Sequence, residues 1–224
     1  MPYLAIDTSS AVAVAVVADD GETLFAASAL EPRRHAELLA TMISDVLRDS
    51  GVARRSLRAV VVGTGPAPFT GLRVGLVTAQ TLGFALGVPV HGVSSLDALA
   101  AGAVRVLALA AGVEVLATGD ARRREVYWAR YRATDARGIE LLAGPGVAQA
   151  ATLVTDGTAA GAVVVGRGAT GYPADLPLVD GAPLDPDPAD LVRLALSRLA
   201  AGESVPTEPL YLRRPDVHGV PAQQ

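Results

Sequence analysis

The residues with the clearest chemical potential follow the first predicted strand. That strand, 3–7, is an apolar run that ends on a carboxylate, and Asp7-Thr8-Ser9-Ser10 follows from that residue. A carboxylate with small hydroxyl residues after a strand is a pattern in which backbone amides can approach a nucleotide phosphate. The position that needs glycine in such a loop is Ser9, whose side chain obstructs that approach. The pattern predicts a degenerate phosphate loop; the alternative is a polar cap that ends the strand and opens a hairpin.

The second dense polar patch is segment 120–128, which reads DARRREVYW. Consecutive arginines beside aromatic residues fit contact with nucleic acid through phosphate pairing and base stacking. The alternative is a hairpin whose turn carries solvated arginines. The net charge of −4 favours the hairpin, because it gives the chain no general attraction for nucleic acid.

Asp7 and Asp120 both end predicted strands, and they could face each other across a cleft as acid and base or as metal ligands.

The amino-acid composition excludes several other kinds of catalytic site. The chain has no cysteine, its three histidines lie far apart, and all 19 basic residues are arginine. These facts exclude a thiolate nucleophile, a Walker-type phosphate loop and a catalytic lysine, and disfavour a histidine metal site. We predict no catalytic residue, no metal site and no tightly bound cofactor.

The helix predicted at 71–87 carries a stripe of small residues. They recur at every fourth position: Gly71, Gly75, Ala79, Gly83 and Gly87. Each interior glycine costs about 1 kcal/mol of helix propensity relative to alanine, and close approach of another backbone is the usual compensation. That backbone belongs either to the protein's own sheet or to a partner.

The helix predicted at 32–50 has an apolar arc of roughly 200°, whereas a core-facing surface helix needs only about 100°. More apolar surface than one sheet can cover predicts a subunit interface. The candidate contact residues on the two helices are His35, Leu38, Leu39, Met42, Val46, Arg73, Leu76 and Gln80. The sequence leaves open whether the Met42 edge or the Leu47 edge faces outward.

The remaining patterns predict an α/β protein with an internal repeat. In the first half we expect strands at 3–7, 11–18, 23–30, 58–63 and 88–91, and a further helix from 94. In the second half we expect strands at 113–118, 125–133, 138–142 and 162–166, a short helix at 147–153 and a last helix at 188–201. Two successive βββαβα units suggest a duplicated fold. Segment 171–188 reads as an exposed loop. Without a signal peptide or an apolar span, we expect a soluble cytoplasmic protein.

Taken together, these segments resemble the TsaB family, the non-catalytic dimerisation subunit of the bacterial tRNA threonylcarbamoyladenosine complex. The matching motifs are IDTSS at 6–10, RHAELL at 34–39, GPAPFTGLRVG at 65–75, DARRREVYWA at 120–129 and PLYLRRPDV at 209–217. The chain departs from the family at Ala67-Pro68, where Gly-Ser is usual, and at Arg124, where a small turn residue is usual.

The resemblance implies an actin-like (ASKHA) fold of two RNase H-like halves, at 1–100 and 101–205, with a tail at 206–224. A fused acetyltransferase, found in some relatives, is not expected here. The resemblance also implies that the chemistry belongs to a TsaD-type partner, which transfers a threonylcarbamoyl group to an adenosine next to the tRNA anticodon. Further implied partners are a TsaE-type ATPase, tRNA through the complex, a second copy of the chain when TsaD is missing, and nucleotide at the partner interface.

Two other functions remain open at this point. An active actin-like kinase would need a glycine-rich adenosine loop, for which segment 161–171 is the candidate. An RNA-binding module would use Arg122–Arg124.

Overall fold

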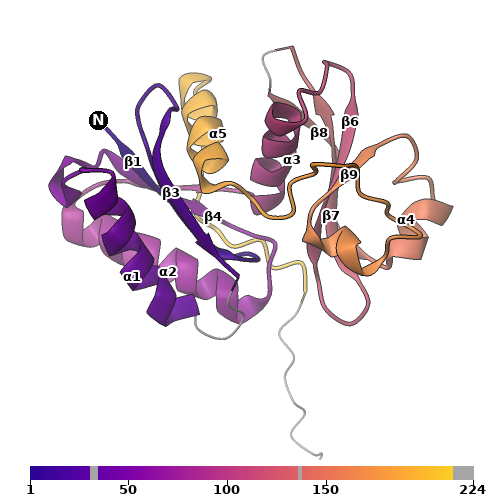
Figure 1. The fold of residues 1–224 in the computed structure, drawn as a ribbon, viewed down its shortest axis with the longest axis horizontal. Coiled ribbons are helices and arrows are strands. Elements are labelled where there is room, and N and C mark those ends of the chain that lie inside the picture. Colours follow the sequence, from indigo (N-terminus) through magenta and orange to yellow (C-terminus); the bar gives the residue numbers. More distant parts are fainter. Residues whose placement is uncertain (31–34, 136–137, 214–224) are drawn as a thin grey trace, which may run out of the picture.

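The computed structural model describes residues 1–30, 35–135 and 138–213, and the side chains of His35 and Ala36 lie outside the description. Two β-sheets stand side by side, with helices between them and on their outer faces (Figure 1). The strands are β1 Tyr3–Asp7, β2 Val12–Val17, β3 Thr23–Ala29, β4 Ala59–Gly63, β5 Val90–Val93, β6 Glu114–Asp120, β7 Val126–Ala133, β8 Ile139–Ala148 and β9 Val163–Val165. The α-helices are α1 His35–Asp49, α2 Phe69–Leu86, α3 Ser95–Val106, α4 Ala150–Thr155 and α5 Pro188–Ala200, and the 3-10 helices are η1 Arg54–Ser56 and η2 Arg167–Gly171.

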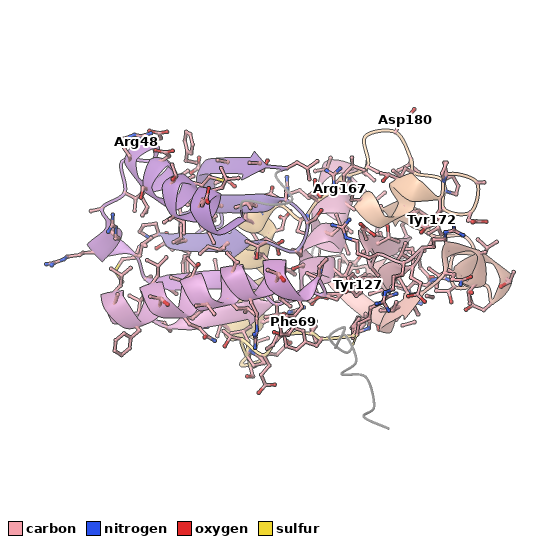
Figure 2. All side chains as sticks on the ribbon, turned by 90° about the horizontal axis from the view of Figure 1, so that it is seen from below. Arg48, Phe69, Tyr127, Arg167, Tyr172 and Asp180 are labelled. Atoms are coloured by element: carbon pink, nitrogen blue, oxygen red, sulfur yellow. The ribbon has the colours of Figure 1, made fainter. Side chains whose placement is uncertain are left out.

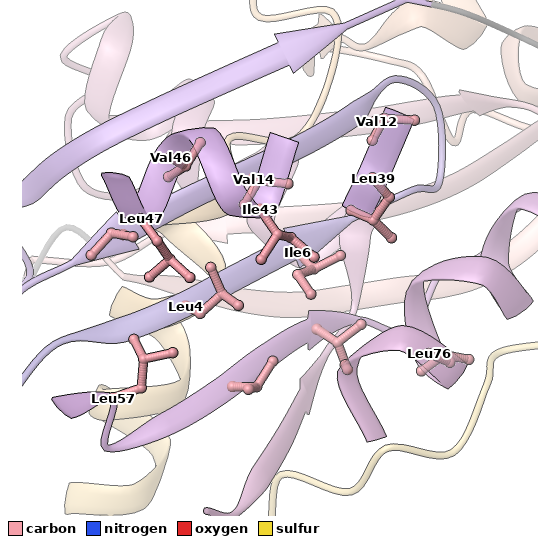
Figure 3. Close-up of a cluster of buried hydrophobic side chains, with 14 of the residues drawn as sticks. Leu4, Ile6, Val12, Val14, Leu39, Ile43, Val46, Leu47, Leu57 and Leu76 are labelled. Atoms are coloured by element: carbon pink, nitrogen blue, oxygen red, sulfur yellow. The ribbon is translucent and has the colours of Figure 1, made fainter. Parts of the chain in front are cut away.

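The first sheet has the strand order β3-β2-β1-β4-β5, in which β1 is antiparallel to β2 and parallel to β4. Its central strands are apolar on both faces, because both faces are covered. Leu4 and Ile6 of β1 pack under α1 and α2, whereas the alternate residues Tyr3 and Ala5 pack against α5. Figure 3 shows α1 lying over the sheet on the first of these faces.

The second sheet repeats this order as β8-β7-β6-β9, again with one antiparallel and one parallel neighbour for its first strand. The repeat confirms the predicted actin-like fold of two RNase H-like halves. One face of the sheet packs against α3, and the other packs with α4 and η2.

Two helices exchange sheets. α3 follows the first sheet in sequence but packs on the second, and α5 follows the second but packs on the first. The two helices contact each other between the sheets (Figure 1). Ion pairs join them: Arg105 of α3 binds Asp187 and the buried Asp190, and Arg198 of α5 binds Asp97. The predicted division at residue 100 falls inside α3.

Some predicted elements shift or lengthen. β5 begins at Val90 rather than Val88, because the Val88 amide donates back to Gly83 and completes the end of α2. β8 continues to Ala148, well past the predicted end at 142. Segment 171–188, expected to be an exposed loop, contains the fully buried Leu176. The described helices include none that is long and apolar enough to cross a membrane.

Candidate functional site

A cavity of about 480 Å³ lies between the two halves. Its walls come from the turn after β1, the start of α2, the start of α3 and the end of β6. The predicted phosphate loop and the predicted arginine hairpin therefore do meet at one cleft, although they are more than 100 residues apart in sequence. Tyr127 and Arg167 line the second half's side of this cleft, and Phe69 marks the start of α2 (Figure 2).

Asp7 is turned into the protein instead of toward this cavity. One carboxylate oxygen accepts hydrogen bonds from the Ser9 amide at 2.8 Å and the Ser9 hydroxyl at 2.5 Å. The other accepts from the Ser95 hydroxyl at 2.6 Å. Burial raises the pKa of Asp7, and these hydrogen bonds oppose the rise only in part. Gly63 leaves the space for the carboxylate, since a Cβ at that position would lie 1.9 Å from it.

The rest of the predicted phosphate loop is also bound to protein groups. Thr8 donates to the Gly71 carbonyl of α2 at 2.8 Å, and Ser10 donates to Asp185 at 2.6 Å. Arg167 holds the same Asp185 carboxylate from the second half, at 2.9 and 2.5 Å. Burial opposes ionisation of Asp185, but the Arg167 guanidinium and the Ser10 hydroxyl outweigh it and lower the pKa of this carboxyl. The loop acts here as a structural junction.

Asp120 has a different environment from Asp7. It lines the cavity, and it accepts a hydrogen bond from the Arg122 amide at 2.8 Å within its own turn. Its carboxylate also pairs with the Arg122 guanidinium at 3.4 Å. One carboxylate is thus committed to Ser9 and Ser95, and the other to its own hairpin. The structure does not arrange Asp7 and Asp120 as an acid–base pair. In the described parts of the chain, no three His, Cys, Asp or Glu residues gather as metal ligands.

The arginine hairpin has an unusual backbone. Arg122, Arg123 and Arg124 all have left-handed conformations, with φ values of 60°, 52° and 62°. Backbone hydrogen bonds from Ala121 to Glu125 and from Glu125 to Arg122 close this turn. Left-handed backbone costs a non-glycine residue roughly 1–2 kcal/mol, so the turn stores strain at the mouth of the cleft.

The glycine-rich segment considered for adenosine binding packs on β6. A Cβ at Gly166 would lie 2.0 Å from the Thr118 carbonyl oxygen, and one at Gly168 would lie 2.6 Å from the Gly119 carbonyl oxygen. Because these two positions carry no Cβ, η2 can pack close to the backbone of β6. Arg167, in the same segment, lines the cavity.

The small stripe on α2 faces the protein's own sheet. A Cβ at Gly75 would lie 2.4 Å from the Thr8 hydroxyl oxygen, and one at Gly83 would lie 2.3 Å from a Val90 methyl group. Ala79, between them, is fully buried. Gly87 has the left-handed φ of 68° and ends the helix. Of the two possible partners for the stripe, the structure selects the protein's own sheet.

The predicted interface residues separate into two groups. Leu39, Val46 and Leu76 lie in the first core with exposed fractions of 1%, 0% and 6%, so they are unavailable to a partner. Leu38 and Met42 are half-buried, whereas Arg73 and Gln80 are exposed. The side chain of His35 is not among those that the structure describes.

Of the two edges of α1, the Met42 edge is the less buried, although Met42 itself packs at the margin of the first core. Leu47 is only 6% exposed and points onto the sheet with Val46 and Ile43 (Figure 3). Sequence reasoning missed two further outward residues, Val77 and Phe84 of α2, which are 58% and 92% exposed. At 100° per residue they share an arc of about 60° with Arg73 and Gln80, so projecting this helix would have found them. We call these four residues the outer α2 face.

Comparisons with known proteins identify relatives of this chain. The family model described as "TsaD: tRNA N6-adenosine threonylcarbamoyltransferase" matches residues 29–175. The tRNA threonylcarbamoyladenosine biosynthesis protein TsaB of Escherichia coli is 35% identical, over 95% of each chain. An uncharacterised protein of Mycobacterium leprae is 42% identical over 98% of this chain, which spans 56% of that protein's length. Among solved structures, YeaZ from Pseudomonas aeruginosa superposes with a TM-score of 0.79 at 35% identity, covering 94% of this chain and 99% of that one.

Proposed function

The chain belongs to the TsaB family, and we propose that it takes part in tRNA threonylcarbamoyladenosine biosynthesis as a non-catalytic subunit that supports a TsaD-type transferase. The observation that carries this proposal is the outer α2 face. Phe84 at its end is 92% exposed, and on α1, which contacts α2, Met42 is only partly buried. Exposed apolar side chains gathered on neighbouring helices are typical of protein–protein contact.

A TsaD-type protein is a fitting occupant of this face. The TsaD family model matches residues 29–175, a range that includes both α1 and α2. A TsaD-type protein should therefore carry counterparts of these helices, and like surfaces pair readily about a two-fold axis. The same argument predicts a homodimer through this face when the partner is missing.

The state of the cleft supports a scaffold role over a kinase. Asp7, Thr8 and Ser10 are all engaged by protein groups, and a phosphate would have to displace Asp185 from Ser10 and Arg167. We propose that nucleotide, where it contacts this subunit, does so at the partner interface. We also propose that tRNA and a TsaE-type ATPase meet the subunit through the assembled complex, in the cytoplasm.

The test is a binding assay between this protein and the TsaD-type protein of the same genome. We expect Phe84→Glu to lower the affinity at least about tenfold, which is about 1.4 kcal/mol. Its melting temperature should stay near that of the wild type, because exposed positions change stability by only about 0.5 kcal/mol. Val154→Glu is the matched control, since Val154 is an exposed valine on α4 of the other half.

A second pair of variants tests the assignment of the α1 edges. Met42→Glu should weaken binding while the protein stays folded. Leu47→Glu should unfold it, because a carboxylate would enter the first core. If Phe84→Glu and Met42→Glu each bind the partner with wild-type affinity, the partner docks elsewhere.

A further inference from the structure

The segment 204–213, which we call the strap, connects the two halves after α5. Its first contacts are with the first sheet. The Gly92 amide donates to the Val205 carbonyl at 2.9 Å, and the Leu210 amide donates to the Thr64 carbonyl at 2.9 Å. The Pro206 carbonyl lies so close to Gly92 that a Cβ there would be 2.1 Å away. In Figure 1 the strap is the yellow trace that runs from α5 toward the space between the halves.

The middle of the strap contacts the start of α2. The rings of Tyr211 and Phe69 lie 5.1 Å apart between centroids, with their planes tilted by 36°. The Arg73 guanidinium carbon lies 4.2 Å from the centre of the same Phe69 ring. Arg73 belongs to the outer α2 face, so Phe69 joins that face to the strap.

The far end of the strap reaches the second half. Leu212 packs against the core beneath α3, and Arg213 forms an ion pair with Glu125. Glu125 closes the left-handed turn between β6 and β7, at the mouth of the cleft. One short extended segment is thus attached to β5, to α2 and to this hairpin.

We propose that the strap is a clasp that holds the two halves at a fixed spacing and couples the outer α2 face to the β6–β7 hairpin. A partner that covers Arg73 removes water from the Arg73–Phe69 contact, and desolvation strengthens a cation–π interaction. Phe69 then holds Tyr211 more firmly, and the strap restrains the hairpin through Arg213. The coupling to a partner rests on the proposed function, whereas the clasp belongs to the free protein.

The first experiment measures amide hydrogen exchange in the free, full-length protein. In Tyr211→Ala we expect the hairpin, residues 120–126, to exchange at least about fivefold faster, the lower end of typical coupling between sites. Exchange in β3, which lies away from the strap, should not change. Leu141→Ala, an exposed leucine on β8, is the control for loss of a surface side chain.

Glu125→Gln is the second route, because it removes only the ion pair and leaves the aromatic contact. It should also speed exchange in the hairpin, by a smaller factor. Two outcomes would overturn the clasp, and both require that hairpin exchange in Glu125→Gln is the same as in the wild type. In the first, Tyr211→Ala also leaves hairpin exchange unchanged. In the second, Tyr211→Ala unfolds the whole protein.

The second experiment repeats the exchange measurement with the TsaD-type partner bound. Wild-type protein should gain protection in the hairpin, and Tyr211→Ala should bind the partner without this gain. Equal protection in both proteins would overturn the coupling and leave the proposed function intact. If the wild-type protein does not bind the partner, the proposed function and the coupling are both wrong. The exchange measurements on the free protein would still test the clasp.

Discussion

The Ser95 hydroxyl donates to the Asp7 carboxylate over 2.6 Å. Ser95 begins α3, which packs on the second sheet, and Asp7 ends the first strand of the first sheet. This hydrogen bond therefore joins the two halves beside the cleft. It also shows that the most suggestive carboxylate in the sequence is buried, with donors from Ser9 and Ser95 on its oxygens.

The pKa of Asp7 gives a prediction about stability and pH. Burial raises this pKa, so the folded protein binds the proton more tightly than the unfolded chain does. The resulting contribution to stability is complete below the unfolded-state pKa, about 3.9, and is lost as the pH rises through the raised pKa. We expect the wild type to lose stability relative to Asp7→Asn over that rise. Urea unfolding of both proteins at stepped pH measures the difference, and parallel curves would contradict it.

The purified protein alone should not turn over ATP. Asp7 is buried and Ser9 stands in the place of a phosphate-loop glycine. Steady-state turnover above about 1 per second, an ordinary kinase rate, would favour the kinase alternative if Asp7→Ala abolished it. Turnover that survives in Asp7→Ala would point to a contaminating enzyme.

Gly75→Ala should destabilise the fold although alanine is the better helix former by about 1 kcal/mol. The new methyl group would lie 2.4 Å from the Thr8 hydroxyl oxygen, and overpacking of this kind costs about 1–3 kcal/mol. Adding Thr8→Ala should recover part of the loss. Gly171→Ala is the matched control, because nothing lies within 4 Å of its added Cβ. If Gly75→Ala is as stable as the wild type but does not bind the partner, the stripe of small residues on α2 belongs to the partner interface.

Arg124→Gly should stabilise the protein. Its φ of 62° costs an arginine roughly 1–2 kcal/mol, and the greater freedom of glycine in the unfolded chain offsets about 0.4–1 kcal/mol of the relief. We expect a net gain of about 0.5–1 kcal/mol in urea unfolding. Arg55→Gly, in η1 and without a left-handed φ, should instead lose stability.

The sequence was sufficient for most of the fold because its signals are local. β1 begins and ends where predicted, and Gly87 ends α2 as its type suggests. β8 extends past its predicted end at 142, through Gly144 and Gly146, and glycine weakens a strand interior in general. Both make room for neighbours instead, since a Cβ at Gly144 would meet the Trp128 carbonyl and one at Gly146 the Trp128 ring.

The candidate site was predicted less well because its decisive facts are tertiary. Periodicity gave the width of the apolar arc on α1, but only packing shows that Leu47 is buried in the first core and that Met42, at its margin, is partly buried. The partners of Asp7 and Ser10 could not be foreseen either. Ser95 and Asp185 lie 88 and 175 residues away from them along the chain.

Because α5 covers one face of the first sheet but follows the second sheet in sequence, that face is covered only after the second half has been synthesised. The five strands of the first sheet are complete once Val93 has been made, but the face that carries Tyr3 and Ala5 is covered by α5, which ends at Ala200. Through the making of roughly a hundred more residues, that face has no cover of its own. The nascent chain must therefore keep an apolar sheet face from aggregating until α5 has been made, and a protein cut between its two halves leaves neither piece with a complete core.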